Sequence, residues 1–115
     1  MLKSFVNAAS GLCHFFLHER NGKIQAAVAV LTLIASYVFK VTLNECAIIL
    51  LCIALVIGLE MINTALEKFC DIVQKEYHPT IKIVKDVAAG AVLFASVLSV
   101  ATGCIIFLPK ILVLL

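Results

Sequence analysis

The sequence has few charged residues and little net charge. Only 14% of its 115 residues are Asp, Glu, Lys or Arg, whereas globular chains average about 25%. The formal net charge is +2, so the chain has no strongly basic face that could neutralise a nucleic-acid backbone. Binding to DNA or RNA is therefore excluded.

Glycine and cysteine motifs are also missing. The five glycines form neither GxxxxGK[ST] nor GxGxxG, which excludes a Walker or Rossmann phosphate site. The five cysteines form no CxxC pair, and a free thiol beside apolar residues packs as a small hydrophobe. The segment from Met1 to Glu19 lacks an unbroken apolar region and an A-x-A site, so no cleavable signal peptide is expected.

Apolar residues, in contrast, make up 63% of the chain, more than a soluble fold of this size could bury. Runs without charge extend from Ile24 to Phe39, from Cys46 to Leu59 and from Val87 to Pro109. The last is long enough for a hydrocarbon core of about 30 Å, and the first, at about 24 Å, is short. The sequence predicts one all-α membrane domain over residues 1–115, with transmembrane helices at about 24–39, 46–67 and 87–109.

Before the first span, apolar residues recur at steps of three and four from Leu2 to Leu17, with polar residues between them. This spacing is typical of an amphipathic helix. We expect a helix at about 2–18 that lies on the membrane surface; an ordinary helix packed on a protein core is the alternative. Further along, Pro79 is expected to end or kink a helix at His78.

Lys and Arg are distributed unequally between the two sides that these spans define. Seven precede the first span or lie between the second and third, and only Lys40 and Lys110 lie on the other side. The positive-inside rule then predicts a cytoplasmic amino terminus, a cytoplasmic segment from Lys68 to Asp86, and a carboxyl terminus outside.

The second span carries an acidic residue, Glu60, about 21 Å from its outer end, where a carboxylate is costly and indicates function. Helical spacing places Asn63, Glu67 and Asp71 on the same face. One interpretation is that these side chains only hydrogen-bond between helices or face solvent. Three short helices cannot easily shield Glu60 and Asn63, so a second subunit is expected to cover them.

The other interpretation is a reaction centre at the membrane surface. Glu60, partly removed from water, suits a general base acting on a weakly acidic hydroxyl. Glu67 and Glu19 offer hard oxygen ligands that suit Mg²⁺. A non-enzymatic membrane subunit and a proton-coupled transporter remain alternatives from other classes.

Several motifs resemble one family over nearly the whole chain. They are Asn7-Ala8 with Gly11-Leu12, Glu19-Arg20-Asn21, Glu60-Met-Ile-Asn-Thr-Ala-Leu-Glu67 with Asp71, Glu76-Tyr77-His78-Pro79, and Lys85-Asp86. Together they closely resemble the prokaryotic diacylglycerol kinase and undecaprenol kinase family of small integral-membrane lipid kinases. The resemblance implies three spans, an amino-terminal surface helix and a homotrimer in the bacterial inner membrane, with active sites between subunits.

The resemblance also implies residue roles in transfer of the γ-phosphate of ATP to a lipid hydroxyl. Glu60 would be the base, Asn63 would support the catalytic face, and Glu19 and Glu67 would hold Mg²⁺ on the ATP phosphates. The further nucleotide contacts would come from Glu76, Tyr77, His78, Lys85 and Asp86.

The lipid substrate is expected to be undecaprenol ahead of diacylglycerol. Ala88-Ala89-Gly90 stands where diacylglycerol-specific members resemble Gly-Ser-Ala, and Glu19-Arg20-Asn21 and Pro109-Lys110 look more like the undecaprenol branch. Gln25 departs from that branch, which often has histidine there.

Overall fold

The computed structural model describes residues 1–115 and is entirely helical. It contains α1 (Leu2–His18), α2 (Arg20–Val38), α3 (Leu43–Val73) and α4 (Pro79–Leu114). The last three are long and apolar enough to cross a membrane. This confirms the all-α class, the three membrane-capable helices and a separate amino-terminal helix.

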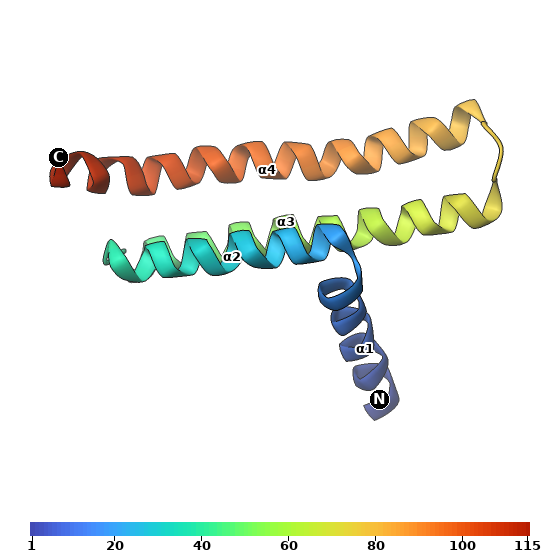
Figure 1. Ribbon diagram of the computed structural model, residues 1–115, viewed down its shortest axis with the longest axis horizontal. Helices are drawn as coiled ribbons and strands as arrows, with labels where there is room; N and C mark the ends of the chain where they lie inside the picture. Colours follow the sequence, from blue (N-terminus) through green and yellow to red (C-terminus); the bar gives the residue numbers. More distant parts are fainter.

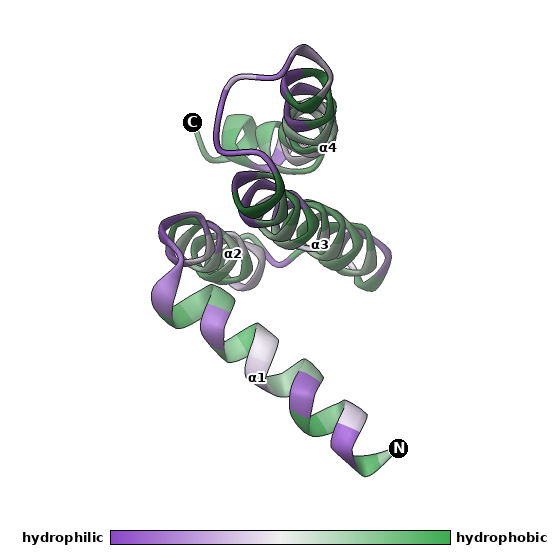
Figure 2. Cartoon of the chain, turned by 90° about the vertical axis from the view of Figure 1, so that its right-hand side faces the viewer, coloured by the Kyte–Doolittle hydropathy of each residue, from purple (hydrophilic) through white to green (hydrophobic).

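α3 is the central helix of the bundle, with α2 on one side and α4 on the other (Figure 2). α1 packs against α2 at its carboxyl end and otherwise projects away from the bundle (Figure 1). Only 10 of the 115 residues are buried, and many large apolar side chains of α2, α3 and α4 face outward. Such a surface is suited to hydrocarbon rather than to water.

The helices are longer than the predicted spans. At 1.5 Å per residue, α3 measures about 46 Å and α4 about 54 Å, whereas a hydrocarbon core is about 30 Å thick. α2, with 19 residues, measures about 28 Å and matches this core. The ends of α3 and α4 beyond the start of α2 (Figure 1) therefore extend past the hydrocarbon.

The expectation that Pro79 ends or kinks a helix was wrong. α3 ends at Val73, and Pro79 is the first residue of α4, with His78 as its amino-terminal cap. The first helical position needs no backbone N–H donor, so proline fits there and its fixed φ favours the helix. The His78 Nδ1 accepts a hydrogen bond from the Thr80 N–H at 3.2 Å.

A single extended residue forms the corner between α1 and α2. Glu19 has φ −94° and ψ 133°, its N–H donates to the Phe15 carbonyl, and its own carbonyl accepts from the Lys23 N–H. Gly22 packs directly on α1 here: a Cβ at Gly22 would lie 2.0 Å from the Phe15 carbonyl oxygen. Only glycine allows the two helices to approach this closely.

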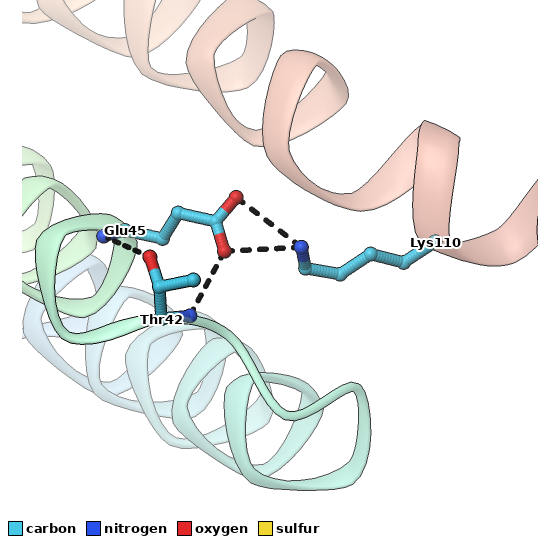
Figure 3. A network of polar contacts seen from close by, with 3 residues as sticks. All are labelled: Thr42, Glu45 and Lys110. Carbon is cyan, nitrogen blue, oxygen red and sulfur yellow. Dashed lines mark hydrogen bonds and ion pairs between the residues drawn. The ribbon is translucent and has the colours of Figure 1, made fainter.

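At the opposite end of the bundle, an ion pair joins α3 to α4 (Figure 3). The Lys110 Nζ lies 3.0 Å from the Glu45 Oε1. Glu45 also completes a capping box with Thr42: the Thr42 N–H donates to Glu45 Oε1 at 2.9 Å, and the Glu45 N–H donates to Thr42 Oγ1 at 3.1 Å. One carboxylate thus both starts α3 and ties it to α4.

Candidate functional site

The polar face of α3 changes from buried to exposed along the helix. Glu60 and Asn63 are each only 6% exposed, Glu67 is half-buried, and Asp71 is exposed. A single chain therefore already shields Glu60 and Asn63, so the premise that three helices cannot shield them was wrong, while a second subunit over this face stays a prediction. The reason is that the first turn of α2 reaches across to α3 at this level.

Glu60 receives its hydrogen bond from the neighbouring helix. Asn21, in the first turn of α2, donates from Nδ2 to Glu60 Oε1 at 2.8 Å. Glu60 makes no ion pair with any cation of the chain. The carboxylate thus lies level with the start of α2.

One turn further along α3, Asn63 and Glu67 form a second polar pair. The Asn63 Nδ2 donates to Glu67 Oε1 at 3.2 Å. The Asn63 Oδ1 is the one fully buried side-chain oxygen or nitrogen without a hydrogen-bond partner. Buried acceptors are nearly always paired, so this oxygen, next to the Glu67 carboxylate, is placed to meet a donor or a cation.

Glu19 connects the corner between α1 and α2 to this part of α3. Its Oε1 lies 2.9 Å from the Lys68 Nζ and 3.4 Å from the His14 Nε2. The hydrogen bond from Lys68, with a smaller contribution from His14, holds the pKa of the Glu19 carboxyl below its usual value. Glu19 is therefore ionised at neutral pH and lies at the Glu67 end of the polar face.

The oxygens of this region are of the kind that a hard cation prefers, although those of a single chain would not surround such an ion. Glu19 and Glu67 supply carboxylates, and Asn63, whose Oδ1 is unpaired, bonds to Glu67 through Nδ2. No three His, Cys, Asp or Glu side chains gather into a metal cluster. Mg²⁺ commonly takes only one or two protein carboxylates and completes its shell with phosphate oxygens and water, so the donor set is compatible with Mg²⁺ bound to a nucleotide.

Charged residues also meet where α3 and α4 approach the connecting loop. Lys85 of α4 forms an ion pair with Asp71 of α3, and Asp86 pairs with Lys82 one turn earlier on α4. Glu76 and Tyr77 are exposed on the loop, and His78 is exposed but caps α4. The expected nucleotide residues therefore lie at one end of the bundle, with only Lys85 tied to the polar face of α3.

Three residues that complete this arrangement had no assigned role from the sequence. Asn21 bonds Glu60 across 39 positions of the chain, Lys68 pairs with Glu19, and Gly22 allows the tight corner. Helical spacing relates residues within one helix only. It therefore offered no signal for contacts between the corner and α3.

Comparisons with known proteins point to one family. Residues 6–107 match the family model described as prokaryotic diacylglycerol kinase. The chain is 41% identical over 108 residues to the undecaprenol kinase of Bacillus subtilis strain 168, an alignment that covers 94% of this chain and 88% of that protein. It is 37% identical over 116 residues to the diacylglycerol kinase of Synechocystis sp. PCC 6803, covering 100% of this chain and 66% of that protein.

Proposed function

The chain belongs to the prokaryotic diacylglycerol kinase family, and on this premise we propose that it transfers the γ-phosphate of ATP to the hydroxyl of a membrane lipid alcohol in a Mg²⁺-dependent reaction. That it is a membrane lipid kinase follows from the family and from the three membrane-capable helices. The observation that carries the detailed mechanism is the buried Glu60 carboxylate, level with the first turn of α2.

Glu60 acts as the general base in this proposal. It accepts the proton of the lipid hydroxyl, the hydroxyl oxygen attacks the γ-phosphorus, the bond to the bridging oxygen breaks, and ADP leaves. Its position supports the role, because lipid hydroxyls lie at the boundary between headgroups and hydrocarbon. The Asn21 bond engages Oε1, so Oε2 is available to take the proton. The lipid hydroxyl would be held in line with the γ-phosphate by positioning rather than by covalent catalysis.

Glu19 and Glu67 would hold Mg²⁺ on the ATP phosphates. When bound, the ion would neutralise phosphate charge and so favour attack by the lipid oxygen. Asn63 supports this function through its bond to Glu67 Oε1, which fixes the direction of that carboxylate. The ion pair with Lys68 fixes the direction of the Glu19 carboxylate in the same way.

The nucleotide would extend from these carboxylates towards the loop between α3 and α4. Lys85 would offset the charge of the phosphates, which requires that it exchange its ion pair with Asp71 for one with phosphate oxygens. Glu76, Tyr77, His78 and Asp86 would contact the rest of the nucleotide. His78 can do so through Nε2, because its Nδ1 is used to cap α4.

The proposal includes a bacterial inner-membrane location with this end of the bundle in the cytoplasm, where ATP is present. The excess of Lys and Arg at this end supports the orientation. We also propose a homotrimer with active sites between subunits. The exposed end of the polar face at Asp71, and the incomplete metal shell, are compatible with a neighbour's contribution. Native mass spectrometry that finds only active monomers in nanodiscs would refute the trimer.

The proposed lipid is undecaprenol ahead of diacylglycerol, in keeping with the higher identity to the undecaprenol kinase. Parallel assays with the two lipids at matched mole fraction, compared by kcat/KM, decide between them. A tenfold preference for diacylglycerol, about 1.4 kcal/mol in transition-state free energy, would reverse the order.

Glu60→Gln tests the mechanism itself. In purified protein with lipid, ATP and Mg²⁺, this variant should fold and assemble as the parent does but show no turnover. Turnover close to that of the parent would remove Glu60 from the role of base. An inactive parent protein with either lipid would count against the proposed substrates.

A further inference from the structure

The Glu60 carboxylate is held by a neutral amide. It is 94% buried, since only 6% of the residue is exposed, and the Asn21 Nδ2 is the one hydrogen-bond donor to it, at 2.8 Å. The other interhelical carboxylate contacts of the chain, at Glu19, Glu45 and Asp71, are made to lysines. Glu60 is the exception, and it is also the carboxylate that the proposed function uses as a base.

A neutral donor and a cation have different effects on a buried base. A lysine or arginine would stabilise the charged carboxylate strongly and so weaken its tendency to accept a proton. An amide N–H satisfies one oxygen and fixes the plane of the carboxylate without cancelling its charge. A base held in this way keeps its second oxygen directed at the proton that it must take.

We propose that Asn21 is a positioning residue for the phosphoryl transfer, which orients the Glu60 carboxylate through the bond from Nδ2 to Oε1. This inference rests on the proposed function, in which Glu60 is the base. Asn21 itself does not touch the reacting atoms in this assignment. Its contribution is to hold Glu60 in one orientation while the lipid hydroxyl approaches.

The fold makes the position of Asn21 well defined. Asn21 is followed by Gly22, which packs on the Phe15 carbonyl, and is preceded within two residues by Glu19, which is paired with Lys68 of α3. The corner is therefore fixed on both sides of Asn21. The Asn21 amide thus joins the first turn of α2 to Glu60, so that the docking of this corner on α3 determines the orientation of the base.

A purely structural role, in which Asn21 only fastens α2 to α3, predicts different results. Loss of a fastening bond lowers stability, but the protein that remains folded keeps its kcat. Loss of an orienting bond lowers kcat in fully folded protein and leaves the KM for ATP nearly unchanged, because the Asn21 side chain bonds to Glu60 and not to a residue proposed to bind nucleotide. The split between kcat and KM therefore separates the two roles.

The experiment compares substitutions at Asn21 in the full chain, purified in lipid and checked for assembly. Asn21→Asp keeps the shape but replaces the donor with a second carboxylate, Asn21→Ala removes the group, and Asn21→Gln keeps an amide one methylene further out. Lys23→Ala is the matched control, since Lys23 is exposed in the same turn and makes no ion pair. Steady-state kcat and KM are measured for ATP and for the lipid.

We expect Asn21→Ala and Asn21→Asp to lower kcat by about 10- to 100-fold at a KM for ATP within about twofold of the parent. Asn21→Gln should recover part of the loss, and Lys23→Ala should behave as the parent. Unchanged kcat in Asn21→Asp and Asn21→Ala would overturn the inference, as would a loss that follows only the folded fraction. Glu60→Gln is assayed in parallel: if it keeps turnover, the proposed base fails, whereas an inactive Glu60→Gln beside fully active Asn21 variants refutes only the role of Asn21.

Discussion

The Lys68 ammonium lies 2.9 Å from the Glu19 carboxylate, and this contact attaches the corner between α1 and α2 to α3. Glu19 is the single extended residue between two helices, so the position of its side chain follows the direction in which both helices leave. The pair therefore sets where α1 meets the bundle of membrane-capable helices, next to the carboxylates proposed for catalysis.

The first prediction concerns the pH dependence of this attachment. Lys68 lowers the pKa of Glu19 from an ordinary value of 4.5. Because the folded-state pKa is lower than the unfolded one, the contact contributes its full stabilisation above pH 4.5 and loses it as the pH falls through the lowered value. Lys68→Met should lower the Tm at pH 7, and the difference from the parent should shrink as the pH falls below 4.5. A difference independent of pH would show that Lys68 stabilises the fold by packing alone.

The second prediction separates the carboxylates by function. Glu19→Gln and Glu67→Gln should raise the Mg²⁺ concentration that nucleotide binding requires, because each removes a proposed ligand oxygen. Glu60→Gln should leave that concentration nearly unchanged, since Glu60 is bonded to Asn21 deeper in the bundle. Titration of Mg²⁺ against binding of a fluorescent ATP analogue measures this. Equal losses in all three variants would leave the carboxylates as one undivided cluster.

The third prediction concerns the close approach at Gly22. A methyl group there would lie 2.0 Å from the Phe15 carbonyl oxygen, so Gly22→Ala must displace the backbone of the corner. Overpacking of this kind costs about 1–3 kcal/mol, and the displaced corner carries Asn21 and Glu19, so activity should fall as well. Thermal unfolding followed by circular dichroism, together with kcat, tests both effects.

Gly11→Ala is the matched control for this substitution. Gly11 lies in the middle of α1 with open space where a Cβ would be, and alanine in a helix interior is favoured over glycine by roughly 0.5–1 kcal/mol. We expect Gly11→Ala to retain activity with an equal or higher Tm. Similar losses in the two variants would mean that helix α1, rather than the corner, is sensitive to any added methyl group.

The fourth prediction concerns the ion pair at the far end of the bundle. Lys110→Met removes the partner of Glu45 and should loosen the packing of α3 on α4, which lowers the Tm by less than Gly22→Ala does. Lys40→Met is the control, because Lys40 is exposed at the same end without an ion pair. Since Glu60 and Glu67 lie about four and six turns along α3 from Glu45, kcat should stay unchanged in both variants below their Tm. A fall in kcat for Lys110→Met but not for Lys40→Met would show that the packing at this end of the bundle affects catalysis.

The sequence by itself determined the class of fold and the membrane setting. Long apolar runs and scarce charge leave hydrocarbon as the one solvent in which this chain can expose its side chains, and helices are the structure that satisfies their backbone there. Periodicity within a single helix also placed Glu60, Asn63 and Glu67 on one face of α3, because the spacing of a helix depends only on local geometry. Each motif that carries the resemblance is likewise local, within α1, the start of α2, α3, the loop or the start of α4.

Only the tertiary structure decided which residues meet across helices. Glu60 is buried within one chain. Two contacts join residues that are 39 or more positions apart: the bond between Asn21 and Glu60, and the pairing of Glu19 with Lys68. Such contacts depend on the angle of the corner at Glu19 and on the space that Gly22 leaves for α1. That angle comes from the close packing of Gly22 on the Phe15 carbonyl and not from the helical pattern. Local reasoning therefore placed Glu60 on the polar face of its helix but did not find Asn21, which bonds to it.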